Sequence, residues 1–210
     1  MTTADDLSKY LRHYESEYEV QYDAPILEII KRNRGFLTPE DVSQIFTWKL
    51  QKHHSVAARK RLDEYVDQFP GLLEEKTALA LSAETDLDAI EQLRGIPQMK
   101  GNSRVAVASC LLMCLDSTRF TVMDRRANES LVMLKPAILE ISRSNNSFDL
   151  VQRNLSKLNP PEGYYALAAD FPEYLATCRE LSLQTNLSLR SLDRALYSAK
   201  GNIALLGKLK

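Results

Sequence analysis

Cysteine and long apolar runs are both scarce in this chain of 210 residues. Three cysteines are too few for a disulfide scaffold, and their odd number fits a reducing cytoplasm. No run of about 18 apolar residues occurs, so we expect no transmembrane helix. Residues 1–6 contain neither a basic segment nor an apolar one, so we expect no secretory signal. These absences predict a cytoplasmic protein that makes no membrane contact.

Residues that bind metals are also sparse. The chain has three histidines, and the neighbours His53 and His54 would point in different directions on a helix. Cys110 and Cys114 lie four residues apart in the apolar run 105–115, which favours two small buried side chains on one helix face. A zinc or iron–sulfur site needs further ligands close by. We therefore expect no metal and no other cofactor.

Glycine is the third scarce residue, with seven in the chain, and strand-like alternation is short. The sequence therefore predicts an all-α fold. The strongest helix start is Thr38, which is followed by proline and two acidic residues. Pro25 and Ser55 are expected to begin two further helices, the second with Val56 facing inward. The segment 142–161 is polar and rich in Asn and Ser, so we expect it to be mostly loop.

The formal net charge of −1 argues at first against nucleic-acid binding, because phosphate recognition needs a local excess of positive charge. The distribution of charge changes that conclusion. Residues 49–61 contain five basic residues and no acidic one, and residues 94–126 carry a net charge of +4. The remaining 164 residues must then carry −10. If the fold brings the two basic segments together, they form a basic cleft.

The centre of the chain carries the most informative pattern. The segments are Leu93-Arg94-Gly95-Ile96, then the small-residue run from Val105 to Leu112, and then the segment from Phe120 to Ala127. A helix, a glycine-bearing hairpin and a second helix rich in small residues resemble a helix-hairpin-helix element at about 86–115. Free backbone N–H groups in such a hairpin can hold a DNA phosphate without reading sequence.

The segment after the hairpin is similar to the corresponding part of the helix-hairpin-helix DNA glycosylases of the endonuclease III type. In that superfamily a short connector leads to a valine–aspartate motif that opens the next helix. Val122-Met123-Asp124 stands at the corresponding place, which implies that Asp124 is the catalytic carboxylate. Bifunctional members carry a Schiff-base lysine 18 residues earlier, where this chain has Ala106. The resemblance therefore implies a monofunctional enzyme, which removes a base without using a lysine.

The resemblance extends over about residues 25–200. The flanking segments are similar to a bacterial family of uncharacterised helix-hairpin-helix proteins that lack the iron–sulfur cluster; they are Gly35–Thr38, Trp48-Lys49, Tyr174, Cys178-Arg179 and Leu189–Tyr197. This likeness implies a two-lobed all-α fold within a single unit, with lobes at 36–134 and at 1–35 plus 135–210. It also implies a monomer. The hairpin departs from the family pattern, because Pro97–Ser103 is an apparent insertion and Arg104 replaces the second glycine.

Several side chains are candidates for DNA contacts around Asp124. A base must leave the double helix to reach such a carboxylate, so aromatic residues are candidates for stacking or wedging. Basic residues and hairpin backbone are candidates for holding phosphates. The stacking candidates are Trp48, Tyr164 and Tyr165, and the DNA-binding candidates are Lys49, Lys52, Gly95, Lys100, Gly101, Arg104, Arg125 and Arg126.

Three functional hypotheses remain open on the sequence. The first is a monofunctional glycosylase acting on double-stranded DNA. Its substrate is an alkylated or oxidised base, in repair, or a bulky modified pyrimidine such as glucosylated hydroxymethylcytosine of phage DNA, in defence. The second is a non-catalytic helix-hairpin-helix DNA-binding protein, in which Asp124 only caps a helix. The third is a helical interaction protein that binds no DNA. Asp193 is expected to form a structural ion pair or a cap near the last helix.

Overall fold

A computed structural model describes residues 4–17, 20–32, 34–50, 52–99, 105–143, 147–158 and 168–206. These residues form helices and connecting turns and contain no strand, which confirms the all-α prediction. The elements are α1 (Ala4–Glu17), α2 (Val20–Arg32), α3 (Pro39–Lys49), α4 (Lys52–Gln68), α5 (Leu72–Ser82), α6 (Asp86–Gln92), α7 (Val105–Leu115), α8 (Arg125–Met133), α9 (Lys135–Arg143), α10 (Phe148–Lys157), the 3₁₀-helix η2 (Ala168–Asp170), α11 (Phe171–Thr185) and α12 (Leu189–Leu206).

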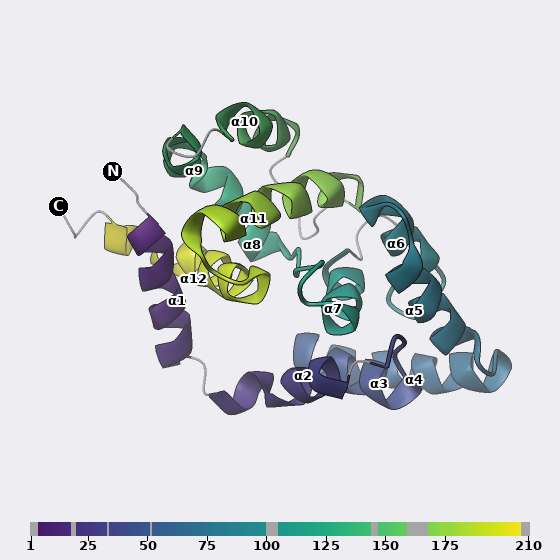
Figure 1. Ribbon diagram of the computed structural model, residues 1–210. Coiled ribbons are helices and arrows are strands. Elements are labelled where there is room, and N and C mark those ends of the chain that lie inside the picture. Colours follow the sequence, from purple (N-terminus) through teal and green to yellow (C-terminus); the bar gives the residue numbers. More distant parts are fainter. Residues whose placement is uncertain are drawn as a thin grey trace.

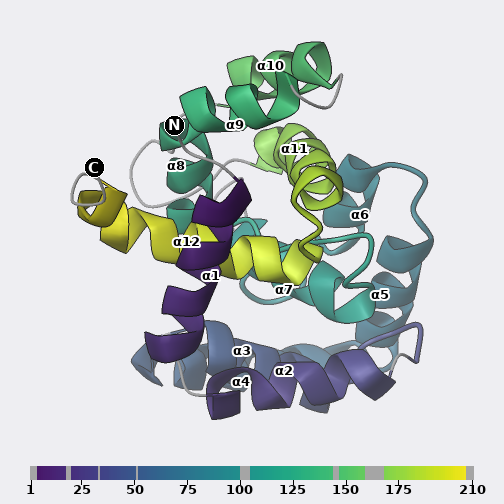
Figure 2. The same cartoon turned by 60° about the vertical axis from the view of Figure 1, so that its left-hand side comes forward.

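The helices pack around α7, which lies inside the molecule (Figure 1). Helices α2, α3, α5 and α6 contact α7, and α2–α4 form one side of the molecule. A view turned by 60° shows α11 and α12 on the opposite side of α7 from α2–α4, with α9 and α10 farther out (Figure 2). Helix α1 packs against α12 and crosses it (Figure 2). Elements from both ends of the chain therefore enclose the central helix.

The apolar sequence of α7 explains its central place. All of its residues except Ala106 are buried, so the helix has no polar face to turn to water. Cys110 and Cys114 are both free and buried on it, which confirms their expected role as small core side chains. Burial raises the pKa of the Cys110 thiol to about 12, so this thiol stays protonated at neutral pH. Neither cysteine is a reactive nucleophile in this setting.

The start of α3 forms as its sequence predicts. Thr38 is the N-cap, its hydroxyl accepts a hydrogen bond from the Asp41 backbone N–H, and the Asp41 carboxylate accepts one from the Thr38 N–H. This reciprocal capping box satisfies two otherwise unpaired donors of the first turn. The spacing of Val42, Ile45, Phe46 and Leu50 predicts a buried stripe. The first three are fully buried, whereas Leu50 is the C-cap and only partly buried.

Three helix boundaries differ from the sequence-based expectations. Helix α2 begins at Val20 and so contains Pro25, rather than beginning there. Helix α4 begins at Lys52, so Ser55 is a buried residue inside the helix and Val56 is exposed, because the helix takes up the residues before the expected cap. The expected loop at 142–161 contains the helix α10. Its buried residues Val151 and Leu155 are four apart, and this short amphipathic stripe is hidden among polar residues.

Helices that the expected lobe boundaries at residues 35 and 134 would separate pack against one another. Helix α8 packs mainly against α12, and α2 packs against α3 and α7. The two-lobed glycosylase architecture therefore stays a prediction, as does the helix-hairpin-helix character of the segment from α6 to α7. No helix in the described part of the chain is both long and apolar enough to cross a membrane.

Candidate functional site

The position of Asp124 is fixed by contacts on both sides of the connector that precedes α8. The Met123 N–H donates to the Ser109 hydroxyl of α7 at 2.9 Å, and the Tyr174 hydroxyl of α11 donates to the Val122 carbonyl at 3.0 Å. Asp124 is the N-cap of α8, and one of its carboxylate oxygens accepts a hydrogen bond from the Ala127 N–H at 2.8 Å. The predicted cap is thus confirmed, and the carboxylate is held rigidly.

The second carboxylate oxygen of Asp124 pairs with Lys49, which lies in the last turn of α3. The Lys49 ammonium donates to it at 3.0 Å, and the two side chains are only 17% and 13% exposed. Burial alone would raise the pKa of Asp124. The Lys49 charge, the Ala127 N–H and Arg126 outweigh that effect and hold the pKa below its ordinary value. Asp124 is therefore an ionised carboxylate at neutral pH.

The same pair determines the state of Lys49. Burial alone would lower the pKa of this lysine, but the charges of Asp124 and Asp193 raise it above its ordinary value. The amine is therefore a buried ammonium ion with a committed partner. This placement differs from the expected contact of Lys49 with a DNA phosphate, because the side chain turns inward to neutralise a carboxylate 75 residues away.

Trp48, the residue before Lys49, is held in a second set of polar contacts. Its indole N–H donates to the Asp23 carboxylate of α2 at 3.0 Å. The same carboxylate accepts hydrogen bonds from Arg190 at 3.0 Å and from Arg194 at 2.6 Å, both on α12. The Arg190 guanidinium also lies 5.3 Å from the centre of the Trp48 ring. Trp48 is therefore anchored at its polar edge, unlike a side chain free to enter a DNA duplex.

Asp193 completes this group of charges. It pairs with Arg190 three residues earlier on α12, which confirms the expected ion pair of the last helix. Burial, aided by the charge of Asp124, outweighs Arg190 and Lys49 and raises the pKa of Asp193 to about 6. We call the whole group the buried ion cluster; its members are Asp23, Trp48, Lys49, Asp124, Arg190, Asp193 and Arg194. The cluster contains three acidic and three basic side chains, so their formal charges cancel.

The two arginines after Asp124 lie on the exposed side of α8. Arg125 pairs with Glu129 one turn further on at 2.8 Å. Arg126 donates to the Tyr197 hydroxyl of α12 at 2.9 Å, and its guanidinium lies 4.9 Å from the centre of the Tyr197 ring. Because Arg126 also acts on the pKa of Asp124, the structure brings an arginine and an aromatic ring close to this carboxylate.

Most of the remaining candidates for DNA contacts lie outside the described residues. Gly95 follows α6 with a φ of +93°, a left-handed conformation that glycine adopts without strain. Lys100, Gly101, Arg104, Tyr164 and Tyr165 lie outside the described residues, as does the side chain of Lys52. Nothing in the described part of the molecule therefore tests the expected phosphate contacts of the hairpin.

Described residues of the two basic segments come together at the ion pair of Lys49 and in a groove beside α4. Lys49 meets Asp124, and Arg61 of α4 lies in one groove with Gly95 and Pro97. At both places an acidic residue accompanies the basic one, since Glu64 lines the same groove as Arg61. The expected contact between the segments is present in these residues, but the local charges there are balanced rather than strongly positive.

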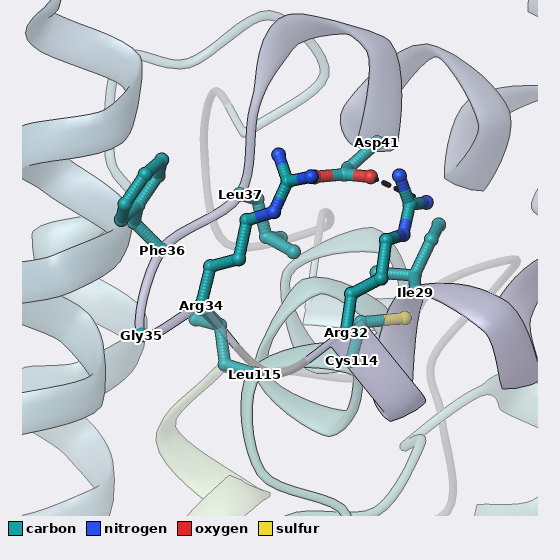
Figure 3. A pocket seen from close by; sticks show the side chains of 9 residues that line it. All are labelled: Ile29, Arg32, Arg34, Gly35, Phe36, Leu37, Asp41, Cys114 and Leu115. Carbon is teal, nitrogen blue, oxygen red and sulfur yellow. Dashed lines mark ion pairs between the residues drawn. The ribbon is translucent and has the colours of Figure 1, made fainter.

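A small cavity lies between α2, the turn before α3, and α7 (Figure 3). Arg32 pairs across it with Asp41 at 2.8 Å, and Cys114 contributes a buried sulfur to the lining. The volume of about 10 Å³ is space for a single water at most. A larger depression of about 510 Å³ lies beside Arg119 and Arg179. Both guanidinium groups there are already bonded to Asp86 or to backbone carbonyls.

Among the described residues, no group of three or more His, Cys, Asp or Glu side chains could hold a metal ion. Comparisons of the chain with protein-family models, with curated proteins and with solved structures find no match. The geometry of the site and the sequence resemblance are therefore what point to a function.

Sequence reasoning missed four residues that contact the site: Asp23, Arg190, Arg194 and Tyr197. The last three belong to the terminal motif Leu189–Tyr197, which carried part of the family resemblance but no chemistry. A usable signal was present, because Arg190, Asp193 and Arg194 interrupt a helix whose neighbours Leu192, Ala195 and Leu196 are apolar. Charged residues in such a stripe are buried with partners. Which partners they find depends on helices far away in the sequence.

Proposed function

We propose that this protein is a monofunctional DNA glycosylase that hydrolyses the N-glycosidic bond of a base flipped out of double-stranded DNA. The observation that carries the proposal is the state of Asp124. Its carboxylate is held between the α8 N-terminus and Lys49, and its pKa is lowered. A short connector separates it from the segment that resembles a helix-hairpin-helix element. The proposed product is an abasic site, from either a damaged base or a bulky modified pyrimidine.

The chemistry of the reaction explains why an ionised, fixed carboxylate matters. Breaking the bond between base and sugar develops positive charge on the sugar, as in other oxocarbenium-like transition states. A carboxylate fixed nearby stabilises that charge without having to reorganise, and it can orient or deprotonate the attacking water. A protonated Asp124 could neither stabilise that charge nor deprotonate the water. The low pKa of Asp124 is therefore suited to this role at neutral pH.

The state of Lys49 supports hydrolysis rather than attack by an amine. A Schiff base requires a neutral amine, and the raised pKa of Lys49 keeps it protonated. Helix α7 has Ala106 where bifunctional relatives carry lysine. The protein should therefore leave intact abasic strands that break only after alkali treatment, and borohydride should trap no covalent complex with DNA.

The experiment is a screen of duplexes that each contain one modified base. The substrates are an alkylated purine, an oxidised purine and glucosylated hydroxymethylcytosine, with unmodified DNA as the blank. The proposal predicts alkali-labile sites at the modified position of at least one duplex. Asp124→Asn, which preserves the shape and can still cap α8, should lose most of this activity. Full activity of Asp124→Asn would exclude the mechanism.

A second candidate function is non-catalytic DNA binding. It is favoured by one observation: both carboxylate oxygens of Asp124 already have partners within the protein. On this hypothesis Asp124 only caps α8 and neutralises Lys49. The protein would then bind DNA in a salt-sensitive manner and release no base from any duplex of the screen. Asp124→Asn would lower its stability but would create no difference in chemistry.

A further inference from the structure

A groove of about 390 Å³ lies on the protein between the C-terminal half of α4 and the turn that follows α6. Small-molecule sites typically have volumes of about 300–1,000 Å³. The groove is separate from the buried ion cluster, with which it shares no residue. Its lining comprises Arg61, Glu64, Tyr65, Gln68 and Phe69 from α4 and its end, and Gly95, Pro97 and Gln98 from the turn.

Two aromatic side chains form the α4 wall of the groove. The rings of Tyr65 and Phe69 lie 5.4 Å apart at an angle of 55°. Tyr65 packs against the hydrophobic core, whereas Phe69 is 41% exposed. A large aromatic side chain held beside a groove in this way offers a flat apolar surface to a planar ligand.

The opposite wall is a tightly built turn. Gly95 and Gln98 both have positive φ values, +93° and +73°. For a glutamine this conformation is uncommon and costs free energy, so the surrounding structure must hold it in place. Ile96 and Met99 do so, because their side chains are buried and the Met99 N–H donates to the Ile96 carbonyl at 2.9 Å. The wall is therefore preformed.

The polar groups of the groove are balanced in charge. Arg61 provides one positive charge and Glu64 one negative charge, and Gln68 provides a neutral amide. The Tyr65 hydroxyl is shielded from solvent without a hydrogen-bond partner among the described residues. Because this oxygen is closed to solvent, a ligand in the groove does not reach it. Because of Glu64, the groove is poorly suited to a phosphate group.

We propose that this groove binds a neutral planar heteroaromatic molecule of the nucleobase class. Its ring stacks on the exposed Phe69 side chain, and the donors and acceptors on its edge bond to Arg61 and Glu64. The balanced charges favour a free base over a nucleotide. The proposal involves no residue of the Asp124 site, so it stands whether or not the protein is a glycosylase.

The test titrates the full chain with adenine and with cytosine, using calorimetry for affinity and backbone amide NMR shifts for location. The proposal predicts saturable binding of at least one base, with shifts concentrated in residues 61–69 and 95–98. Phe69→Ala should weaken that binding about tenfold, because stacking of a base on an aromatic ring contributes on that scale. Phe69 is half exposed, so this variant should remain folded.

Two further measurements make the test decisive. Tyr65→Phe removes a hydroxyl that the groove does not expose, so it should leave base binding unchanged and the melting temperature of the free protein equal or higher. Asp124→Asn should bind the base as the parent protein does. The proposal is overturned if neither base binds, if Phe69→Ala binds equally well, or if the shifts lie outside the groove. Tighter binding of adenosine monophosphate than of adenine, or of an aromatic peptide than of either base, would also overturn it.

Discussion

At the scale of single residues, the Lys49–Asp124 pair is the most informative feature of the molecule. Each partner is mostly withdrawn from water, where an isolated charge is very costly. When the two charges are paired, their attraction offsets the cost of burying them, and each keeps the other ionised. Removing one partner of a buried pair leaves the other charge uncompensated, at a cost of about 3–5 kcal/mol. The pair is therefore a strong constraint on the state of Asp124.

Lys49→Met should destabilise the protein by about 3 kcal/mol at neutral pH for this reason. The effect should depend on pH. In the parent protein the lowered pKa of Asp124 provides stability that is present above the unfolded value and is lost as pH falls through the folded one. In Lys49→Met burial dominates and raises the pKa of Asp124, so stability falls as pH rises. The free energy of unfolding in urea should differ between the parent protein and Lys49→Met at both pH 4 and pH 7, and the difference should be larger at pH 7.

Lys49→Arg is the matched control for that variant, because it keeps the positive charge while changing the shape. Its stability should follow the pH dependence of the parent protein. A difference between parent and Lys49→Met that is the same at both pH values would contradict the electrostatic account. It would indicate that the lysine contributes through packing of its aliphatic stem alone.

At the scale of elements, the sequence predicted best where the signal is local. The cap of α3 at Thr38 and the cap of α8 at Asp124 follow from residues within one turn of each helix, and both are confirmed. Helix α10 was missed because its buried face is only a few residues long and lies among Ser, Asn and Asp, which are typical of loops. The start of α4 was misplaced because Ser55 resembles a cap yet is buried within the helix.

Thr38→Ala tests the energetic weight of the cap that positions α3, and with it Lys49 at the other end of the helix. The change removes the hydroxyl that accepts from the Asp41 N–H, which should cost about 1 kcal/mol in the free energy of unfolding. Thr38→Ser keeps that acceptor and should cost much less. Equal losses in the two variants, measured by chemical denaturation, would show that the capping bond contributes little.

The candidate site was predicted only in part, and the division again follows distance in the sequence. The sequence singled out Asp124, Arg126, Trp48 and Lys49, which the structure places within one region. It assigned Lys49 to DNA because the five basic residues at 49–61 suggested an exposed surface. The actual partner of Lys49 lies 75 residues away, and only the approach of the end of α3 to the residue that caps α8 reveals it.

At the scale of the whole molecule, buried carboxylates join helices that are far apart in the chain. Asp23 of α2 accepts hydrogen bonds from Trp48 of α3 and from Arg190 and Arg194 of α12. Asp86 at the start of α6 does the same for Arg179 of α11, at 2.7 Å and 3.0 Å. Two acidic residues outside the basic segments, Asp23 and Asp86, thus connect earlier helices of the chain with α11 and α12.

Asp23→Ala should therefore weaken the connection between α2, α3 and α12. It leaves two guanidinium groups and the indole N–H without their acceptor in a mostly buried region, so we expect a loss of about 3 kcal/mol or more. Hydrogen exchange should rise in all three helices together. An increase confined to α2 would indicate that Asp23 does not couple these elements. Asp63→Ala, at an exposed position of α4, is the control.

The most direct test of the central claim is the release of free base from one modified duplex under single-turnover conditions. The substrate is the duplex on which the screen finds activity, and the released base is measured by mass spectrometry alongside DNA affinity. The account predicts that Asp124→Asn binds the duplex about as tightly as the parent protein but releases base at least about a hundredfold more slowly. Asp63→Asn, an exposed control, should release base at the parent rate. Equal rates for Asp124→Asn and the parent protein, at equal affinity, would contradict the account.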